Sequence, residues 1–442
     1  MLTRLLPAIA ASTLVVSACS SGTQPAATSQ PQPTSAPPTA VPAAAKAQST
    51  AQLAATPQPA AAGQGATVKF ASIHPLTGAL ASSGIQMDRA VKLAVDTLNG
   101  AGGIKALNSA KLEAMSADTQ GKPDVAQSEA QRLMDGGAAA IIGTYQSAAT
   151  VTVAQAAERA QVPLIIDVSV ADNITQNGYK YTFRVQPNAT SMGTYGARYL
   201  KQIADKTGQP VKTVGYLHEP SDFGTSVFSA FKSEAEKQGM TISKEVTYEL
   251  TNTDLTAQAT QALAANPDVL AVTGYFADGV TLAKNLGLIK PGIKAVWGVA
   301  NGAFDAPDFP AAVGNLGNTY FDANYHYDAS SKHLQEVRAQ YKQQFGEDMR
   351  TEAVYAYQDV YVLAEALERA GSADPRAIRD ALAKTALKSD LLPMLGPIEF
   401  DERGENTNAA PIINQVQGDQ VLQVFPDNAA EKPPIFPGTP WS

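Results

Sequence analysis

The stretch AAAIIGTYQSAAT, residues 138–150, contains two elements from which the fold can be inferred. Residues 139–142 form a short apolar run of the kind found in buried strands. Residues 143–150 form a loop of small and polar residues that opens a helix expected over 148–160. A buried strand followed at once by a helix indicates a parallel sheet with helices on both faces.

The same alternation of strand and helix continues on both sides of this stretch. Strands are expected over 67–73, 111–117, 139–142 and 164–166 and, after a restart, over 213–217, 242–248, 269–273 and 295–298. Helices are expected over 86–98, 123–134 and 148–160 and then over 224–238, 256–265, 279–286 and 352–370, with closing strands around Ile398, Ile412 and Val421. The restart favours two similar halves over one very large sheet, so the predicted fold class is α/β.

Composition excludes several classes of protein. The part from Thr67 onward is too long for one ordinary core and suits two lobes. The chain has a formal net charge of −8, and Arg4 and Lys46 are the only charges before Thr67. An acidic domain without clustered basic residues does not suit nucleic acid. The single cysteine excludes an internal disulfide, and His218, His326 and His333 show no metal-ligand spacing, so we expect no metal and no cofactor.

The N-terminus predicts export. Arg4 precedes the apolar run 5–16, which is too short to cross a bilayer and ends at Val16-Ser17-Ala18-Cys19. Residues 1–18 are therefore interpreted as a signal peptide. Residues 19–66 consist mainly of Ala, Pro, Gln, Ser and Thr, and we expect them to form a disordered linker because they cannot bury enough apolar surface to fold.

The carboxyl ends of the expected strands give a candidate ligand site, because ligands of open parallel sheets bind beyond those ends. The candidates are His74, Ser83, Ser147, Ala148, Ser169, Ala171, Tyr275, Phe276 and Asn301. Hydroxyl, amide and aromatic groups from two lobes would enclose a small organic molecule. Structural alternatives stay open for several of them: Ser147 also suits a helix N-cap, His74 a hydrogen-bonded loop, and Phe276 an ordinary core.

At these residues the chain resembles the type I periplasmic solute-binding proteins, specifically the branched-chain amino acid (Leu/Ile/Val) binding family that serves ABC importers. The resemblance rests on the order and spacing of several strings: ASIHPLTGALASSG, LNGAGGI, AAAIIGTYQSAAT, VPLIIDVSVADNIT, YTFRVQPNATSMG, VTGYFADGVTLAKNLGLIKPG and AYQDVYVLAEALERAG. It implies two Rossmann-like lobes with parallel central sheets, joined by a multi-strand hinge. On this basis lobe 1 is expected at 67–187 plus about 322–392, and lobe 2 at 188–321 plus about 393–442.

The resemblance also implies roles for individual residues. The family's hydroxyl and amide pair that binds the ligand's carboxylate falls on Ser147 and Ala148. Backbone groups near Ser169 and Ala171 complete the carboxylate-binding end of the site. The tyrosine of the second lobe that closes over the ligand falls on Tyr275. Cys19 matches the lipobox cysteine of bacterial lipoproteins, which implies an anchor in the cell membrane by lipidation.

The two acids that amino-acid binders place around the ligand's ammonium group are not matched. Their positions fall near 188–189 and 300–301, where the chain has Asn-Ala and Ala-Asn. A buried ammonium without a carboxylate would carry a desolvation cost of several kcal/mol, so the sequence favours a carboxylate, amide or aromatic acid without a free amine. Asp167, Asp172 and Asp278 remain alternative sources of the charge.

The sequence therefore predicts an extracytoplasmic, lipid-anchored binding protein of an ABC importer, a monomer that captures a small solute by closure of two lobes and delivers it to a membrane permease. A branched-chain amino acid binder and a ligand-sensing module are the alternatives. The chain lacks G-x-S-x-G, H-E-x-x-H, C-x-x-C and Walker A motifs, so we do not expect an enzyme.

Overall fold

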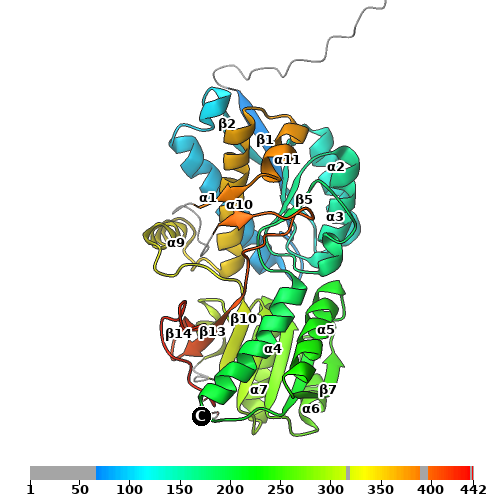
Figure 1. Ribbon diagram of the computed structural model, residues 1–442, viewed down its shortest axis with the longest axis vertical. Helices are drawn as coiled ribbons and strands as arrows, with labels where there is room; N and C mark the ends of the chain where they lie inside the picture. Colours follow the sequence, from blue (N-terminus) through cyan, green and yellow to red (C-terminus); the bar gives the residue numbers. More distant parts are fainter. Residues whose placement is uncertain (1–65, 315–318, 389–396, 439–440, 442) are drawn as a thin grey trace, which may run out of the picture. The chain divides into compact units, whose positions relative to one another are not determined.

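The computed structural model describes residues 66–314, 319–388, 397–438 and 441 (Figure 1). The described residues belong to one compact unit, and the expected signal peptide and Cys19 lie outside the described residues. Two main sheets organise the unit, with strand orders β2-β1-β3-β4-β5 and β14-β13-β10-β9-β8-β6-β7. We call the parts built on them lobe 1 and lobe 2. The predicted α/β class with parallel central sheets is confirmed.

Lobe 1 begins with a parallel sheet flanked by helices. Its elements are β1 (Thr67–His74), α1 (Ala81–Gly100), a 3₁₀ turn (Lys105–Leu107), β2 (Lys111–Asp118), α2 (Pro123–Asp135), β3 (Ile141–Gly143), α3 (Ser147–Ala160), β4 (Leu164–Ile166), a 3₁₀ turn (Asp172–Ile174) and β5 (Thr182–Arg184). The strands pair in parallel throughout, for example Ala71 with Ile141. Because both faces of the sheet are covered by helices, β3 and β4 are wholly apolar or glycine and fully buried.

Lobe 2 repeats the plan. It contains α4 (Ala189–Lys206), β6 (Thr213–His218), α5 (Asp222–Lys237), β7 (Thr241–Thr247), α6 (Thr256–Leu263), β8 (Val269–Gly274), α7 (Phe276–Ile289), β9 (Ala295–Asn301), α8 (Phe309–Val313) and β10 (Tyr320–Asn324). Antiparallel strands β13 (Ile412–Gln417) and β14 (Gln420–Phe425) extend the sheet beyond β10. Trp297 is fully buried on β9, where its indole N–H donates to the carbonyl of Gly196 at 3.1 Å, so it belongs to the core.

A third segment returns to lobe 1 before the chain ends. It contains α9 (Lys332–Phe345), α10 (Thr351–Ala370), α11 (Pro375–Leu382), β11 (Ala386–Leu387) and β12 (Ile398–Glu399). Helix α10 packs along α1, where the orange and blue helices of Figure 1 lie side by side. The chain therefore passes between the lobes three times: after β5, after β10 and before β13.

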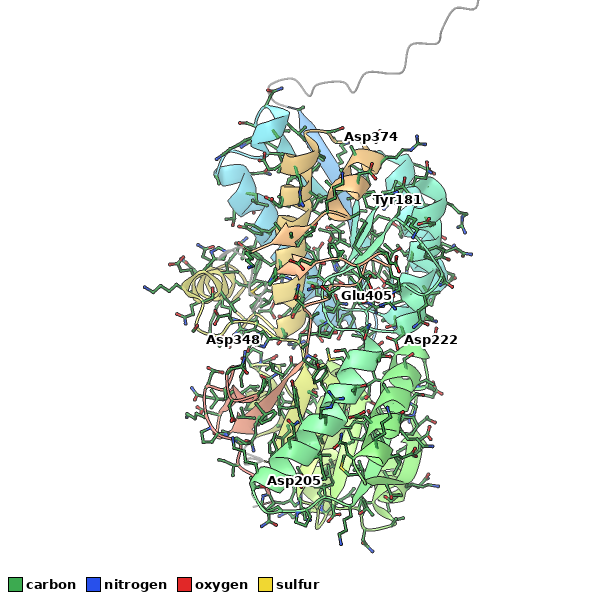
Figure 2. All side chains as sticks on the ribbon, viewed as in Figure 1. Tyr181, Asp205, Asp222, Asp348, Asp374 and Glu405 are labelled. Carbon is green, nitrogen blue, oxygen red and sulfur yellow. The ribbon has the colours of Figure 1, made fainter. Side chains whose placement is uncertain are left out.

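The last return to lobe 2 comes later in the chain than the expected position near 393. Glu405 bridges to Arg184 at the end of β5, and its carboxylate pairs with the guanidinium at 2.8 Å (Glu405 is labelled in Figure 2). Residues 398–406 therefore accompany lobe 1, and the chain reaches lobe 2 only at β13. Strand β10, in turn, belongs wholly to the sheet of lobe 2, although the expected boundary of 322 would divide it.

Candidate functional site

A cavity lies where residues of the two lobes meet. Lobe 1 contributes Tyr145, Ser147, Val168, Ser169, Val170, Thr351 and Glu352. Lobe 2 contributes Phe223, Gly274, Tyr275, Ala300, Gly302, Asp305 and Asn324, and Tyr325 follows at the start of the second crossing. A lining of apolar and aromatic residues with a few polar groups is typical of sites for small organic molecules.

One end of the cavity offers hydroxyl groups and the start of a helix. Ser147 is the first residue of α3, and its hydroxyl oxygen accepts a hydrogen bond from the amide of Ala171 at 3.2 Å. The hydroxyl of Ser169 donates to the carbonyl of Tyr145 at 3.0 Å. The side chain of Gln146, the N-cap residue, does not cap α3, so the first-turn amides and the positive end of the helix suit a carboxylate.

Aromatic rings form the walls. The ring of Tyr275 lies 5.4 Å from that of Tyr145 and 5.2 Å from that of Phe223, measured between centroids. Tyr325 donates its hydroxyl hydrogen to the carbonyl of Val168 at 2.6 Å, which links the second crossing to lobe 1. Burial raises the pKa of Tyr145 and Tyr275 well above the usual range, so both phenols are neutral. Neutral rings and hydroxyls suit an apolar or aromatic body.

The backbone around the cavity adopts conformations that few side chains tolerate. Tyr145 and Ala300 have φ values of 61° and 53°, in the left-handed region that non-glycine residues seldom occupy. At Gly274 an added Cβ would lie 2.2 Å from both the Asp278 carboxylate and the Tyr248 hydroxyl. Unfavourable backbone of this kind gathers at functional sites, where the surrounding packing holds it in place.

Two carboxyl groups lie at the cavity, and the sequence analysis did not find either of them. Asp305 follows β9 in lobe 2, and Glu352 lies in the first turn of α10 in lobe 1. Both are buried, with 3% and 4% of their surface exposed. The strand-end rule reaches as far as Asn301 and could have been extended to Asp305. Nothing in the sequence indicates that the start of α10 meets lobe 2.

The two positions where amino-acid binders of the family have acids, near 188–189 and 300–301, contribute no charge to the cavity. The conclusion that the cavity lacks acids does not follow from this. Asn188 caps α4 by accepting from the Ser191 amide at 2.9 Å, and Ala300 contributes no charge. Asp305 and Glu352 supply acids from other elements instead. The sequence argument assumed a cavity without carboxyl groups. That assumption is wrong, because Asp305 and Glu352 line the cavity.

The three alternative acids are engaged elsewhere and do not line the cavity. Asp167 accepts from the fully buried His74 ring at 2.7 Å. Asp172 accepts from the hydroxyl of Thr190 at the start of α4. Asp278 completes the capping box of α7.

The predicted ligand residues divide into two groups. Ser147, Ser169 and Tyr275 line the cavity. Ala171 lies behind Ser147 and fixes its hydroxyl through the hydrogen bond given above, whereas Ala148 is half-buried next to Ser147 and is not part of the lining.

The other candidates lie outside the lining. His74 is held by Asp167 within lobe 1. Ser83 is buried beside Tyr145 and Glu352. Asn301 is buried behind Ala300, and its side-chain oxygen accepts from the amide of Ala303 at 3.0 Å. Phe276 lies under the guanidinium of Arg350. The sequence analysis did not find Phe223, Tyr325 or Thr351.

Polar contacts hold the lobes together beside the cavity. The Arg350 guanidinium of lobe 1 pairs with both carboxylate oxygens of Asp308 in lobe 2, at 3.0 and 2.7 Å, and lies 3.5 Å from the centroid of the Phe276 ring. Asp222, labelled in Figure 2, begins α5 of lobe 2 and accepts from Asn173 of lobe 1 at 2.8 Å. These contacts join the two lobes on either side of the cavity.

Comparison with known proteins places the fold in a family. The family profile described as "Periplasmic binding protein" matches residues 67–420. The Leu/Ile/Val-binding protein homolog 8 of Brucella abortus (strain 2308) is 30% identical over 376 residues, which cover 83% of this chain and 92% of that protein.

Solved structures agree with this assignment. A leucine binding protein, LivK, from Thermotoga maritima MSB8 superposes with a TM-score of 0.70 at 22% identity, covering 82% of this chain and 99% of that one. A solute binding protein of an ABC transporter from Rhodopseudomonas palustris BisB5, in complex with 3,4-dihydroxy benzoic acid, gives a TM-score of 0.67 at 25% identity, covering 82% and 94%. The family profile and the curated relatives show that the chain belongs to the periplasmic binding protein family, of the Leu/Ile/Val-binding type.

Proposed function

We propose that this protein is the substrate-binding component of an ABC importer and that it captures a small organic solute bearing a carboxylate. The observation that carries this proposal is the cavity between the lobes, at which Ser147 opens α3. A carboxylate there would meet the first-turn amides of α3, the positive end of the helix and the Ser147 hydroxyl, whose hydrogen is not used in its bond with Ala171. The aromatic walls support a carboxylate, amide or aromatic acid as the class of solute.

Closure would follow from the division of the site between the lobes. A solute first held by Ser147 and Ser169 of lobe 1 gains contacts with Tyr275 only when lobe 2 approaches. Binding therefore favours the closed form, because only that form offers both sets of contacts. The closed protein would then dock on a membrane permease, where opening releases the solute.

A branched-chain amino acid is the second candidate, and Asp305 and Glu352 favour it. Their carboxyl groups lie in the same cavity as Ser147 and could pair with an ammonium group. The Leu/Ile/Val-binding type of the curated relatives supports the same reading.

A thermal-shift panel on the whole protein tests the function. The panel pairs leucine, isoleucine and valine with benzoate, 3,4-dihydroxybenzoate, acetamide and urea. A solute at about a hundredfold excess over its dissociation constant stabilises the folded state by about 2.7 kcal/mol, which raises the melting temperature measurably. If no member of the panel changes the melting temperature, capture of solutes of these classes is refuted.

Replacing Ser147 with alanine is expected to weaken binding of the best carboxylate solute by about 10- to 150-fold, since a hydrogen bond to a charged group contributes about 1.5–3 kcal/mol. The variant also leaves the Ala171 amide without its acceptor. Calorimetric titration measures the change. Ser128→Ala, on the exposed side of α2, is the matched control. An unchanged affinity in Ser147→Ala would remove this residue from the site.

We also propose that Cys19 carries a lipid anchor outside the cytoplasm. Cys19→Ser is expected to abolish incorporation of labelled fatty acid and to move the protein from the membrane fraction to the soluble fraction, because no acyl chain remains to bury. Fractionation of expressing cells, followed by immunoblotting, measures this. A variant that stays with the membrane would contradict the anchor.

A further inference from the structure

A second pocket lies where the second and third crossings meet lobe 2, and none of its residues lines the solute cavity. His326 of the second crossing, Pro411 of the third and Tyr199 of α4 line it. The other lining residues come from the third crossing, from β13 and from the segment after β14: Asn408, Ala410, Ile412, Pro426, Asn428 and Ala429. The pocket has a volume of about 150 Å³, and a cavity of about that volume holds a molecule the size of benzene.

The imidazole of His326 brings a polar atom without a partner to this pocket. Only 8% of the residue's surface is exposed, and its ring atom Nε2 is buried with no hydrogen-bond partner among the described residues. Burial lowers the pKa of His326 to about 4, against the opposing charge of Asp328, so the ring is neutral near pH 7. Buried polar atoms normally have partners, so this atom calls for a hydrogen-bonding group that the chain itself does not supply.

Hydrogen bonds and ring packing hold the walls of the pocket in place. The Tyr355 hydroxyl donates to the carbonyl of His326 at 2.6 Å, and the side chain of Gln423 donates to the carbonyl of the following residue at 2.8 Å. The ring of Tyr199 packs against that of Phe425, with 5.0 Å between the centroids. The pocket is therefore formed in advance, as ligand sites usually are.

The lining selects an uncharged molecule. With the imidazole neutral, none of the lining residues carries a charge, so an ion bound there would be desolvated without a partner. Pro411, Ile412 and Pro426 offer apolar surface, and the imidazole and two asparagine side chains offer hydrogen bonds. A neutral imidazole has one N–H donor and one acceptor nitrogen. A carboxamide has both a donor and an acceptor, so it can pair with Nε2 in either tautomer of the ring.

We propose that this pocket is a second binding site, and that it takes an uncharged molecule with an apolar body about the size of benzene and a carboxamide group that pairs with His326. Its ligand differs in charge from the carboxylate proposed for the solute cavity. The proposal therefore does not rest on the proposed function.

Histidine ring signals in nuclear magnetic resonance test the site on the whole protein. The chain has four histidines, so labelled histidine gives four sets of ring signals, and His326→Phe identifies the set that belongs to the pocket. We expect 4-fluorobenzamide to shift the His326 signal saturably, with a dissociation constant of about 1–10 mM, as for a small fragment. The charged 4-fluorobenzoate should bind there at least about tenfold more weakly. A His326 signal that 4-fluorobenzamide leaves unchanged, or that both probes shift alike, overturns the proposal.

Filling the pocket should remove the response while His326 stays in place as the reporter. Ala429 is a half-buried residue of the lining, and in Ala429→Leu the larger side chain should weaken binding of 4-fluorobenzamide by at least about tenfold. Ala264→Leu is the matched control, because Ala264 is exposed at the end of α6 and does not line the pocket. An Ala429→Leu protein that responds as wild type does would show that the probe binds elsewhere.

His326→Phe tests the imidazole itself, since phenylalanine keeps a ring but has no hydrogen-bonding atom. Binding to this variant is followed by the fluorine signal of the probe, and the affinity should fall about 2- to 12-fold, the loss expected for one neutral hydrogen bond. His333→Gln should leave the affinity unchanged, because His333 also has an unpartnered Nε2 among the described residues but lies outside the pocket. Equal affinity in His326→Phe and wild type would refute the pairing with His326. Failure of every solute in the thermal-shift panel would refute the proposed function instead.

Discussion

Replacing Arg184 with alanine is expected to lower the free energy of unfolding by about 3–5 kcal/mol, which is the cost of breaking a buried ion pair from one side. The Arg184 side chain is fully buried, and its guanidinium donates to Glu405 at 2.8 and 3.1 Å. It also donates to the carbonyls of Ser169 and Ala171, both at 3.0 Å. The variant would leave the buried Glu405 carboxylate without its cationic partner, with only the Thr175 hydroxyl still donating to it among the described residues. The carbonyls of Ser169 and Ala171 would each lose one donor and keep one, from Gln186 and from the Ile174 amide. Urea unfolding followed by circular dichroism measures the loss.

Two further variants separate the ion pair from general damage. The double variant Arg184→Met/Glu405→Leu should recover much of the stability, because apolar residues of similar size often replace a buried ion pair at little cost. Arg132→Ala is the surface control: Arg132 is exposed and pairs with Glu129 on α2, so its loss should cost less than about 1 kcal/mol. An Arg184→Ala protein as stable as wild type would contradict this account of the buried pair.

Replacing Arg350 with alanine is expected to weaken solute binding by about 30- to 100-fold. The guanidinium joins the lobes through Asp308 and the Phe276 ring, and the pair is partly buried, with 6% and 34% of the side chains exposed. Truncating one partner of such a charge pair costs about 2–3 kcal/mol, and here the cost applies to the closed form alone. The apparent affinity falls with the population of the binding-competent form. Calorimetric titration with the best solute of the panel measures the change.

The control for Arg350 is Arg198→Ala, which removes a pair with Glu234 lying within lobe 2 and should leave the affinity unchanged. Arg350→Lys should give an intermediate affinity, since lysine keeps the charge but loses the bidentate geometry and the stacking on Phe276. If Arg350→Ala binds as tightly as wild type, the contact does not contribute to closure.

Much of the fold could be predicted from the sequence because alternation of buried strands and amphipathic helices is a local signal. Helix α4, however, was not predicted. Its glycines resemble helix breakers, but at Gly193 an added Cβ would lie 2.5 Å from the backbone of α5. Glycine there permits close packing of two helices, and only the tertiary structure reveals that reason.

The site was predictable to the extent that it follows strand ends. Ser147, Ser169 and Tyr275 follow strands of the two sheets, and all three line the cavity. Glu352 begins a helix far along the chain, and its place in the cavity depends on the return of the chain to lobe 1 after β10. The position of such a residue is set by how the lobes are connected, which no local pattern encodes.

The three crossings also bear on when folding can finish during synthesis. Lobe 1 includes α10 and β12, which come more than 150 residues after β5 in the chain. The sheet of lobe 2 is completed by β13 and β14, which are the last strands of the chain to be synthesised among the described residues. Neither half is a continuous segment, so an emerging N-terminal portion lacks the partners that would bury its apolar faces, and contacts distant in sequence form slowly. For a chain that we propose is exported, this delay would keep the precursor extended enough to be threaded through a membrane pore.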